Sequence, residues 1–329
     1  MKQTKIVFLD AATFGDASLR RFTDAWDCET HQATKPTDVI ARLAGKTIVV
    51  TNKVAINHAM LSAPQAQTLS LIVVAATGID IIDRTAARGR NVKVCNVPGY
   101  AAQSVAQFTM ALILELATYA GRYGSAVKAG EWQKSSVFSL LAYPTVELSG
   151  KQLGIIGYGS IGRAVAQMAR SFGMDVAVAA RSEVPDPRSE DRIPLEQLFR
   201  QVDIISLHCP LTPQTQNLVN EQSLRLMKPS AILINTARGA LVDEAALIRA
   251  LRERRLAAAA LDVITQEPPA ADHPIIVAAG ELDNLLVTPH IAWSAREARE
   301  RLLNEVAENI SAFLNGKDRN LVGWQKSCD

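Results

Sequence analysis

Short apolar runs rich in β-branched residues recur along the first hundred residues and alternate with segments of helical spacing. Such runs are typical of strands that are buried on both faces of a parallel sheet. Strands that alternate with helices in this way predict a small α/β unit. The expected strands are 5–10, 47–51, 71–76 and 92–95, and the expected helices are 16–25, 37–43 and 58–63.

The same alternation resumes near residue 148 and predicts a second, larger unit. Helical segments separate most of its strands, which is the arrangement of a doubly wound parallel sheet. The expected strands are 153–156, 176–180, 204–208, 231–235, 257–261 and 285–288, and the expected helices are 161–172, 195–201, 221–227 and 244–254.

Two further helical segments complete the predicted fold. Residues 104–128 are mostly apolar and predict one long helix with Ser104 as its N-cap. Residues 294–314 predict an amphipathic helix, which we expect to pack back onto the first unit because it cannot form a domain alone. We therefore predict an α/β protein of two Rossmann-like, doubly wound parallel-sheet domains with the cofactor cleft between them. The expected substrate domain is discontinuous, 1–100 with 293–329, and the expected dinucleotide-binding domain is 101–292.

Residues 151–163, KQLGIIGYGSIGR, place three glycines between an expected strand and an expected helix. Gly157 permits a tight turn, Gly159 lets the backbone approach phosphates, and Gly162 lets the helix pack closely on the strand. The N–H groups of such a turn, together with the helix N-terminus, bind a pyrophosphate. GxGxxG alone is a weak signal, but the strand before it and the helix after it are the required context. The sequence therefore predicts a dinucleotide site here.

Arg238, Glu267 and His290 follow the fourth, fifth and sixth expected strands of the second unit. Because parallel strands end at one edge of their sheet, we expect these side chains on the edge that carries the glycine turn. Each alone has an ordinary explanation: a surface charge, a turn before proline, or a hydrogen-bonded structural histidine. Three such residues beside a nucleotide turn favour a catalytic site.

The chemistry that suits these groups is hydride transfer to a 2-oxo acid. Arg238 offers paired N–H donors to the substrate carboxylate or carbonyl oxygen. His290 can donate the proton that accompanies the hydride. Glu267, hydrogen-bonded to that imidazole, favours its protonated form. In the oxidation direction, neutral His290 would act as the base.

The motifs GYGSIG, INTARGALVDEAAL, ALDVITQEPP and TPHIAWSAREAR, in this order, resemble those of the D-isomer-specific 2-hydroxyacid dehydrogenases over essentially the full length. VTNKV, VAATGID, VCNVPGYAAQSVAQ and GEWQKS are similar to the glycerate dehydrogenase (hydroxypyruvate reductase) branch of that family. The resemblance implies Arg238, Glu267 and His290 as the catalytic residues.

The resemblance also implies the residues that bind the substrate and the cofactor. Backbone N–H groups around Thr77 and Gly78 would bind the substrate carboxylate with Lys53 assisting. We also predict that Trp293, after the catalytic histidine, contacts the substrate; the alternative is ordinary interface packing. Members of the family are usually homodimers joined by the helix that corresponds to 104–128. With the glycine turn and the strand end at His208, the predicted cofactor contacts are Ser104, Gly157, Tyr158, Gly159, Ser160, Ile161, Gly162, His208, Pro210, Thr215, Thr236, Ala237, Asp262 and Ala292.

The end of the second strand of the larger unit bears on which nicotinamide cofactor binds. NAD sites usually place an acidic residue there to bind the ribose hydroxyls. Here the strand ends in Arg181 and Ser182, and Asp175 lies at its start. Arg181 and Ser182 can hold a 2′-phosphate, so we predict a preference for NADP. The alternative is NAD, with Arg181 solvated and Glu183 bound to the ribose.

Composition narrows the classes of function. The 329 residues give room for two domains, and 48% hydrophobic and 21% charged residues are ordinary for a globular protein. A net charge of +2 without a basic block argues against a nucleic-acid partner. No membrane segment or signal peptide is expected. The four cysteines have no CxxC spacing, which predicts reduced thiols, no metal site and a cytoplasmic protein.

We therefore expect an NADP(H)-preferring reductase that converts hydroxypyruvate or glyoxylate to D-glycerate or glycolate. Asp80 departs from the branch, which commonly has ATGTNN where this chain has ATGIDI. A carboxylate there would weaken binding of an anionic substrate unless it points away. The alternatives are a D-lactate-type reductase of broad 2-oxo acid range and a non-catalytic, nucleotide-sensing corepressor on the same fold.

Overall fold

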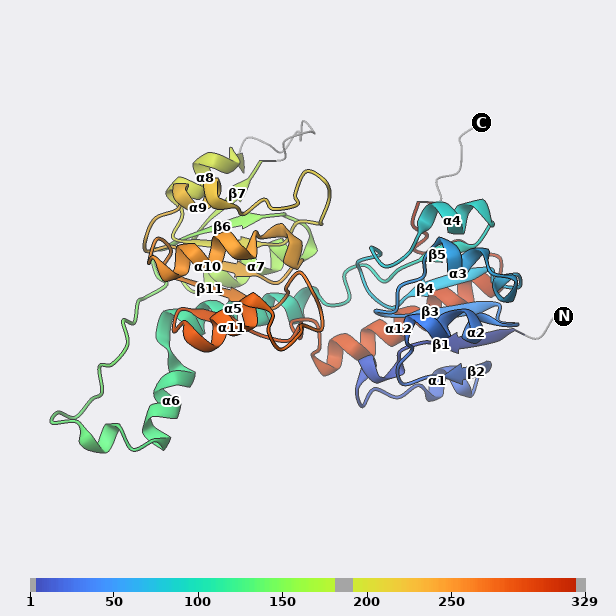
Figure 1. Ribbon diagram of the computed structural model, residues 1–329, viewed down its shortest axis with the longest axis horizontal. Coiled ribbons are helices and arrows are strands. Elements are labelled where there is room, and N and C mark those ends of the chain that lie inside the picture. Colours follow the sequence, from blue (N-terminus) through green and yellow to red (C-terminus); the bar gives the residue numbers. More distant parts are fainter. Residues whose placement is uncertain (1–3, 181–191, 324–329) are drawn as a thin grey trace. The chain divides into compact units, whose positions relative to one another are not determined.

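A computed structural model describes residues 4–180 and 192–323. The chain divides into two compact units, Met1–Ala101 with Ser294–Asp329 and Ala102–Trp293 (Figure 1). Each unit is built on its own parallel sheet with helices. The prediction of two α/β parallel-sheet domains is therefore confirmed.

The first unit has a five-stranded parallel sheet in the order β2-β1-β3-β4-β5. Its central strands are apolar and buried at nearly every position, as expected for a sheet covered on both faces. The C-terminal helix α12 packs against β4 with Leu302 and Val306 fully buried. The elements are β1 (Lys5–Phe8), α1 (Arg20–Thr23), β2 (Asp27–Thr30), α2 (Val39–Leu43), β3 (Ile48–Thr51), α3 (His58–Ser62), β4 (Leu71–Val74), α4 (Arg84–Gly89), β5 (Lys93–Cys95) and α12 (Arg296–Leu314).

One expectation for the first unit was wrong, and two of its elements, β2 and α4, were not predicted. The helix expected over 16–25 is only the single turn α1. The edge strand β2, with the sequence DCET, was not predicted. Its residues are exposed or half-buried, so its sequence has no alternation of apolar and polar positions. The strand is held in the sheet by parallel pairing with β1.

The second unit has a seven-stranded parallel sheet in the order β12-β11-β10-β9-β6-β7-β8. The chain winds outward from β6 in one direction and then returns to continue from β9 in the other. Ligands bind at such a reversal, beyond the carboxyl ends of the two strands. The elements are α5 (Ala102–Thr118), α6 (Ala120–Lys128), β6 (Gln152–Ile156), α7 (Ser160–Ser171), β7 (Asp175–Ala179), β8 (Arg192–Ile193), α8 (Leu195–Gln201), β9 (Ile204–Leu207), α9 (Glu221–Leu226), β10 (Ile232–Asn235), α10 (Glu244–Arg252), β11 (Ala258–Leu261), α11 (Pro274–Glu281) and β12 (Leu285–Val287).

The long helix expected over 104–128 is two helices, and Ser104 is not its N-cap. Helix α5 ends at Thr118, and Tyr119 adopts a left-handed conformation with φ 53° before α6 begins. Ser104 lies inside the first turn of α5, where its hydroxyl donates to the Ala292 carbonyl at 2.7 Å. Helix α11 and the short strand β8 were also not predicted.

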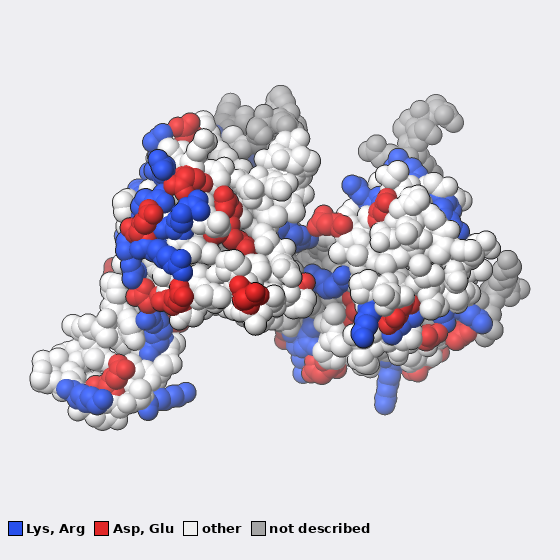
Figure 2. Space-filling view, in the orientation of Figure 1, with Lys and Arg blue, Asp and Glu red and all other residues white. Residues whose placement is uncertain are grey.

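A segment that we call the arm, residues 119–147, extends from the end of α5 through α6 and a long loop (Figure 1). Its base is ordered by Tyr143, whose N–H donates to the Tyr123 hydroxyl at 3.0 Å and whose ring lies 4.5 Å from the Arg122 guanidinium. Farther out, Phe138 is 93% exposed and Leu141 87% exposed. Much of the arm's surface is uncharged in Figure 2.

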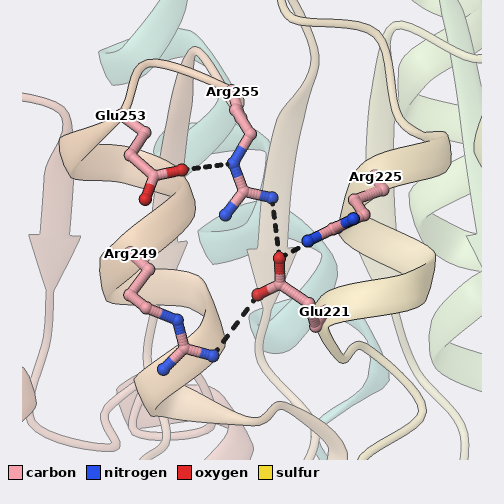
Figure 3. A pocket seen from close by; sticks show the side chains of 5 residues that line it. All are labelled: Glu221, Arg225, Arg249, Glu253 and Arg255. Carbon is pink, nitrogen blue, oxygen red and sulfur yellow. Dashed lines mark hydrogen bonds and ion pairs between the residues drawn. The ribbon is translucent and has the colours of Figure 1, made fainter.

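A network of ion pairs joins α9, α10 and the turn before β11 on the outside of the second unit (Figure 3). The Glu221 carboxylate lies 3.1 Å from Arg225, 3.3 Å from Arg249 and 3.1 Å from Arg255, which also pairs with Glu253 at 2.6 Å. The hydrogen bond from Arg225 is the main cause that lowers the pKa of Glu221. Each guanidinium here pairs with a carboxylate, so the pocket is a structural junction between helices.

Candidate active site

The glycine turn lies where the strand order of the second sheet reverses, between β6 and β9. Gly157 has φ 99°, and a Cβ there would stand 2.4 Å from the Cys209 nitrogen and from the His208 carbonyl carbon. A Cβ on Gly162 would stand 2.2 Å from the Gly157 oxygen. Both positions therefore require glycine for packing.

Gly159 differs from the other two glycines because a Cβ there would meet open space. It is the N-cap of α7 and offers no side-chain cap to the helix N-terminus. Tyr158, Ser160 and Ile161 continue the turn into that helix. Uncapped N–H groups and the positive end of a twelve-residue helix beside open backbone fit the pyrophosphate of a dinucleotide.

His208 follows β9 and lies against the glycine turn. Its Nε2 is 2.8 Å from the Ser206 hydroxyl, while its buried Nδ1 has no hydrogen-bond partner among the described residues. Burial lowers the pKa of the His208 imidazole to about 4 and raises the pKa of the neighbouring Cys209 thiol to about 11. Both side chains are therefore uncharged at neutral pH.

Predicted cofactor residues also follow the neighbouring strands β9 and β10. Thr215 donates to the Pro210 carbonyl at 2.7 Å and closes the loop after β9. The buried Thr236 hydroxyl, after β10, lies 3.1 Å from that of Thr109 on α5. Arg181 and Ser182 lie outside the described residues.

Arg238 is presented by a turn whose backbone the buried Asn235 side chain holds. Asn235 Oδ1 accepts from the Ala237 N–H at 3.0 Å, and its Nδ2 donates to the Arg238 carbonyl at 2.8 Å. The half-buried guanidinium donates to the Ala237 carbonyl at 2.7 Å. The sequence analysis did not single out Asn235, although an amide at a buried strand end is a signal that could have found it.

His290 and Glu267 approach each other from the loops that follow β12 and β11. His290 Nδ1 lies 2.5 Å from Glu267 Oε2, and the other carboxylate oxygen accepts from the Ile264 N–H at 2.9 Å. The His290 side chain is 24% exposed, so the pair remains accessible at the edge of the sheet. Trp293 donates its indole N–H to the His290 carbonyl at 3.1 Å. A carboxylate on Nδ1 leaves Nε2 of the imidazolium to give a proton.

Asp262 shapes the segment that carries His290. Its buried carboxylate accepts from the Thr288 hydroxyl at 2.6 Å and from the N–H groups of Ile291 at 3.0 Å and Ala292 at 2.8 Å. Burial raises the pKa of Asp262, and these hydrogen bonds act against that rise. His290 itself has φ 54°, an uncommon conformation for a residue other than glycine, and its N–H donates to the Asp262 carbonyl at 2.8 Å.

The predicted substrate residues of the first unit follow its neighbouring strands β3 and β4. Lys53 lies after β3, in a turn whose N–H groups donate to the buried Asp10 carboxylate, at 2.6 Å from Lys53 itself. Burial raises the pKa of Asp10, which the sequence analysis did not consider. Thr77 precedes Gly78 after β4 and donates to the Val97 carbonyl at 2.9 Å. Asp80 is exposed.

The described residues contain neither a candidate metal site nor a membrane-spanning helix. No group of three His, Cys, Asp or Glu side chains is placed to hold a metal ion in 4–180 and 192–323. Within the same residues, no helix combines the length and apolar character needed to cross a membrane.

Comparisons with known proteins agree on one family. The profile of the D-isomer specific 2-hydroxyacid dehydrogenase NAD binding domain matches residues 110–292. The chain is 40% identical over 319 residues to a glycerate dehydrogenase of Methylorubrum extorquens, covering 97% of this chain and 98% of that protein. It is 35% identical over 325 residues to a hydroxypyruvate reductase of Blautia hydrogenotrophica, covering 97% and 99%.

A solved structure gives the same result for the fold. The crystal structure of a protein from Thermus thermophilus matches with a TM-score of 0.84 at 32% sequence identity. The match covers 97% of this chain and all of that one.

Proposed function

Because the chain belongs to the D-isomer-specific 2-hydroxyacid dehydrogenase family, we propose that it reduces hydroxypyruvate or glyoxylate to D-glycerate or glycolate. The observation that carries this proposal is the 2.5 Å contact between His290 and Glu267, on the sheet edge where the Arg238 turn and the glycine turn also lie. The names of the glycerate dehydrogenase and hydroxypyruvate reductase relatives support the substrate class.

In the proposed mechanism, the bound nicotinamide cofactor supplies the hydride. Arg238 binds the substrate through its carboxylate or C2 carbonyl oxygen, which two parallel N–H donors suit. His290 gives the proton on Nε2 to the C2 oxygen as negative charge develops there. Glu267 accepts from Nδ1 and stabilises the imidazolium before that transfer. In the reverse reaction, neutral His290 takes the hydroxyl proton.

We propose that the second unit binds the cofactor through the glycine turn and the neighbouring strand ends. We propose that the first unit is the substrate domain, in which Lys53 and the backbone at Thr77 and Gly78 bind the carboxylate. The order of the first sheet supports this role, because Lys53 follows β3 at the point where that order reverses.

We propose NADPH as the preferred form of the cofactor. Support comes from strand β7, whose acidic residue Asp175 stands at its beginning rather than at its end. Arg181 and Ser182 follow that end in the sequence and match the needs of a 2′-phosphate. We further propose that the protein is a homodimer, which the apolar side chains that the arm exposes support. We also propose a cytoplasmic location, which the four cysteines without CxxC spacing support.

A substrate panel tests these proposals. Oxidation of NADPH and of NADH would be followed with hydroxypyruvate, glyoxylate, pyruvate and phenylpyruvate, with His290→Ala as the control. We expect the fastest turnover with hydroxypyruvate and glyoxylate, faster with NADPH than with NADH, and almost none in the variant. Faster turnover with phenylpyruvate would favour the broad D-lactate-type reductase, and nucleotide binding without turnover would favour a corepressor. Faster turnover with NADH would refute the NADPH preference.

A further inference from the structure

The loop that carries Glu267 is hydrogen-bonded near its start to a carboxylate on a neighbouring helix, and its last residue lies near the same carboxylate. This loop, residues 262–273, connects β11 to α11. Glu244, the first residue of α10, accepts from the Thr265 N–H at 2.7 Å and from the Thr265 hydroxyl at 3.1 Å. Its Oε2 lies 3.8 Å from Nε2 of His273, the last residue of the loop. The side chains of Glu244 and His273 are 12% and 9% exposed, so both are largely shielded from water, whereas Thr265 itself is exposed.

The peptide between Ile264 and Thr265 is held from two sides. On one side is Gly239, the residue after Arg238, where a Cβ would stand 2.0 Å from the Ile264 carbonyl carbon and 2.5 Å from the Thr265 nitrogen. On the other side is the Glu244 carboxylate. The N–H of Ile264 in turn fixes one oxygen of Glu267. This N–H belongs to the peptide before Ile264, so the position of the Glu267 carboxylate depends on a residue whose following peptide Glu244 and Gly239 hold.

Glu244 is not needed to cap its own helix. Asp243 is the N-cap of α10 and accepts from the Ala246 N–H at 3.0 Å. A carboxylate in the first turn contributes to helix stability through the helix dipole, typically by about 0.3–1 kcal/mol. That contribution does not require the side chain to turn to another loop and accept two hydrogen bonds there.

We propose that Glu244 is a positioning residue, which holds the loop so that Glu267 meets His290 in the geometry that the proton transfer needs. This proposal rests on the proposed function for its kinetic consequences only. Loss of Glu244 would let the Thr265 region move, and a small displacement of a catalytic group is enough to lower the rate by a large factor.

The kinetic test compares five variants. Glu244→Ala should lower kcat by about 10- to 100-fold with KM nearly unchanged, because the fault lies in the chemical step. Glu244→Gln should retain most of the activity, since an amide can accept from the Thr265 N–H and donate to its hydroxyl oxygen. Glu196→Ala is the matched control, because Glu196 occupies the first turn of α8 and pairs only locally with Arg200. Finally, Glu244→Ala combined with Glu267→Gln should be no slower than Glu267→Gln alone.

A structural test needs no activity. Hydrogen–deuterium exchange of the protein without ligands should be faster over 262–268 in Glu244→Ala and unchanged there in Glu196→Ala. The proposal is wrong if exchange in this loop does not rise in Glu244→Ala. It is also wrong if the losses of kcat from Glu244→Ala and Glu267→Gln multiply in the double variant. If the wild-type protein reduces none of the acids, the proposed function fails while the exchange result still decides whether Glu244 anchors the loop.

Discussion

His290 Nδ1 and Glu267 Oε2 lie 2.5 Å apart, although the two residues come from loops after different strands. The Ile264 N–H donates to the other oxygen of Glu267, so the two carboxylate oxygens have separate partners. Residue 267 must therefore accept a hydrogen bond at both of its terminal atoms, which a carboxylate can do and an amide cannot.

Glu267→Gln should therefore be much more damaging than its small change in shape suggests. The Ile264 N–H will hold the amide oxygen, which turns the amide NH₂ toward His290 Nδ1 and disfavours a proton there. Imidazolium then becomes costly, and we expect kcat to fall by about 100- to 10,000-fold, as for loss of a general acid. Steady-state kinetics would measure this, with Glu281→Gln, on the exposed part of α11, as the control. A loss of less than tenfold, below the range that general acids contribute, would contradict the assigned role.

The strand ends were predictable because buried parallel strands leave a strong apolar signal. The runs that end before Arg238 and Glu267 are buried throughout, and the run before His290 is apolar and buried or half-buried. Strands of one parallel sheet end on one edge, so the side chains that follow them could be placed together from the sequence.

Other features depend on contacts that leave no local signal. The break at Tyr119 involves neither glycine nor proline at the residue with positive φ. The Asp10 carboxylate binds backbone N–H groups of a turn that begins 42 residues later in the chain, a partner that only the folded structure reveals. Polar residues at buried strand ends mark such positions, but the sequence does not say which loop they hold.

Two glycine variants should separate the folding of the turn from its binding of the cofactor. Gly157→Ala places a Cβ 2.4 Å from backbone atoms of the β9 end at φ 99°, so we expect a loss of stability of about 1–3 kcal/mol or more. Gly159→Ala meets open space and should leave the melting temperature nearly unchanged. It should nonetheless weaken NADPH binding, because its methyl group occupies the approach to the phosphates. Thermal melts and fluorescence titration would measure both. Unchanged NADPH affinity in Gly159→Ala would place the phosphates elsewhere.

Protonation of His208 should destabilise the protein in mild acid. Its pKa of about 4, against 6.5 for an ordinary histidine, means that the unfolded chain binds more protons between these two values. Stability is then complete above about pH 6.5 and is lost as the pH falls toward 4, by up to about 3 kcal/mol.

His208→Gln removes this titration and should flatten the pH dependence of the free energy of unfolding over the same interval. Urea denaturation between pH 4 and 7 would measure it, covering the window set by the folded and ordinary pKa values of His208. The control is His58→Gln, which replaces an exposed histidine. An equally steep decline in His208→Gln and the wild-type protein would show that another group causes it.

Charge on the arm should prevent the proposed homodimer. Phe138 and Leu141 are 93% and 87% exposed within one chain, and burying one such side chain is worth about 1.5–3 kcal/mol. A two-fold dimer that covers the arm would bury each side chain twice, so Phe138→Asp should raise the dimer dissociation constant by roughly 100-fold or more.

Size-exclusion chromatography with light scattering would measure the mass of the Phe138→Asp variant, and thermal melts at low concentration would show that the monomer still folds. Val277→Glu, at an exposed apolar position on α11 outside the arm, is the control. If Phe138→Asp and Leu141→Asp both remain dimeric, the contact between subunits lies elsewhere on the chain.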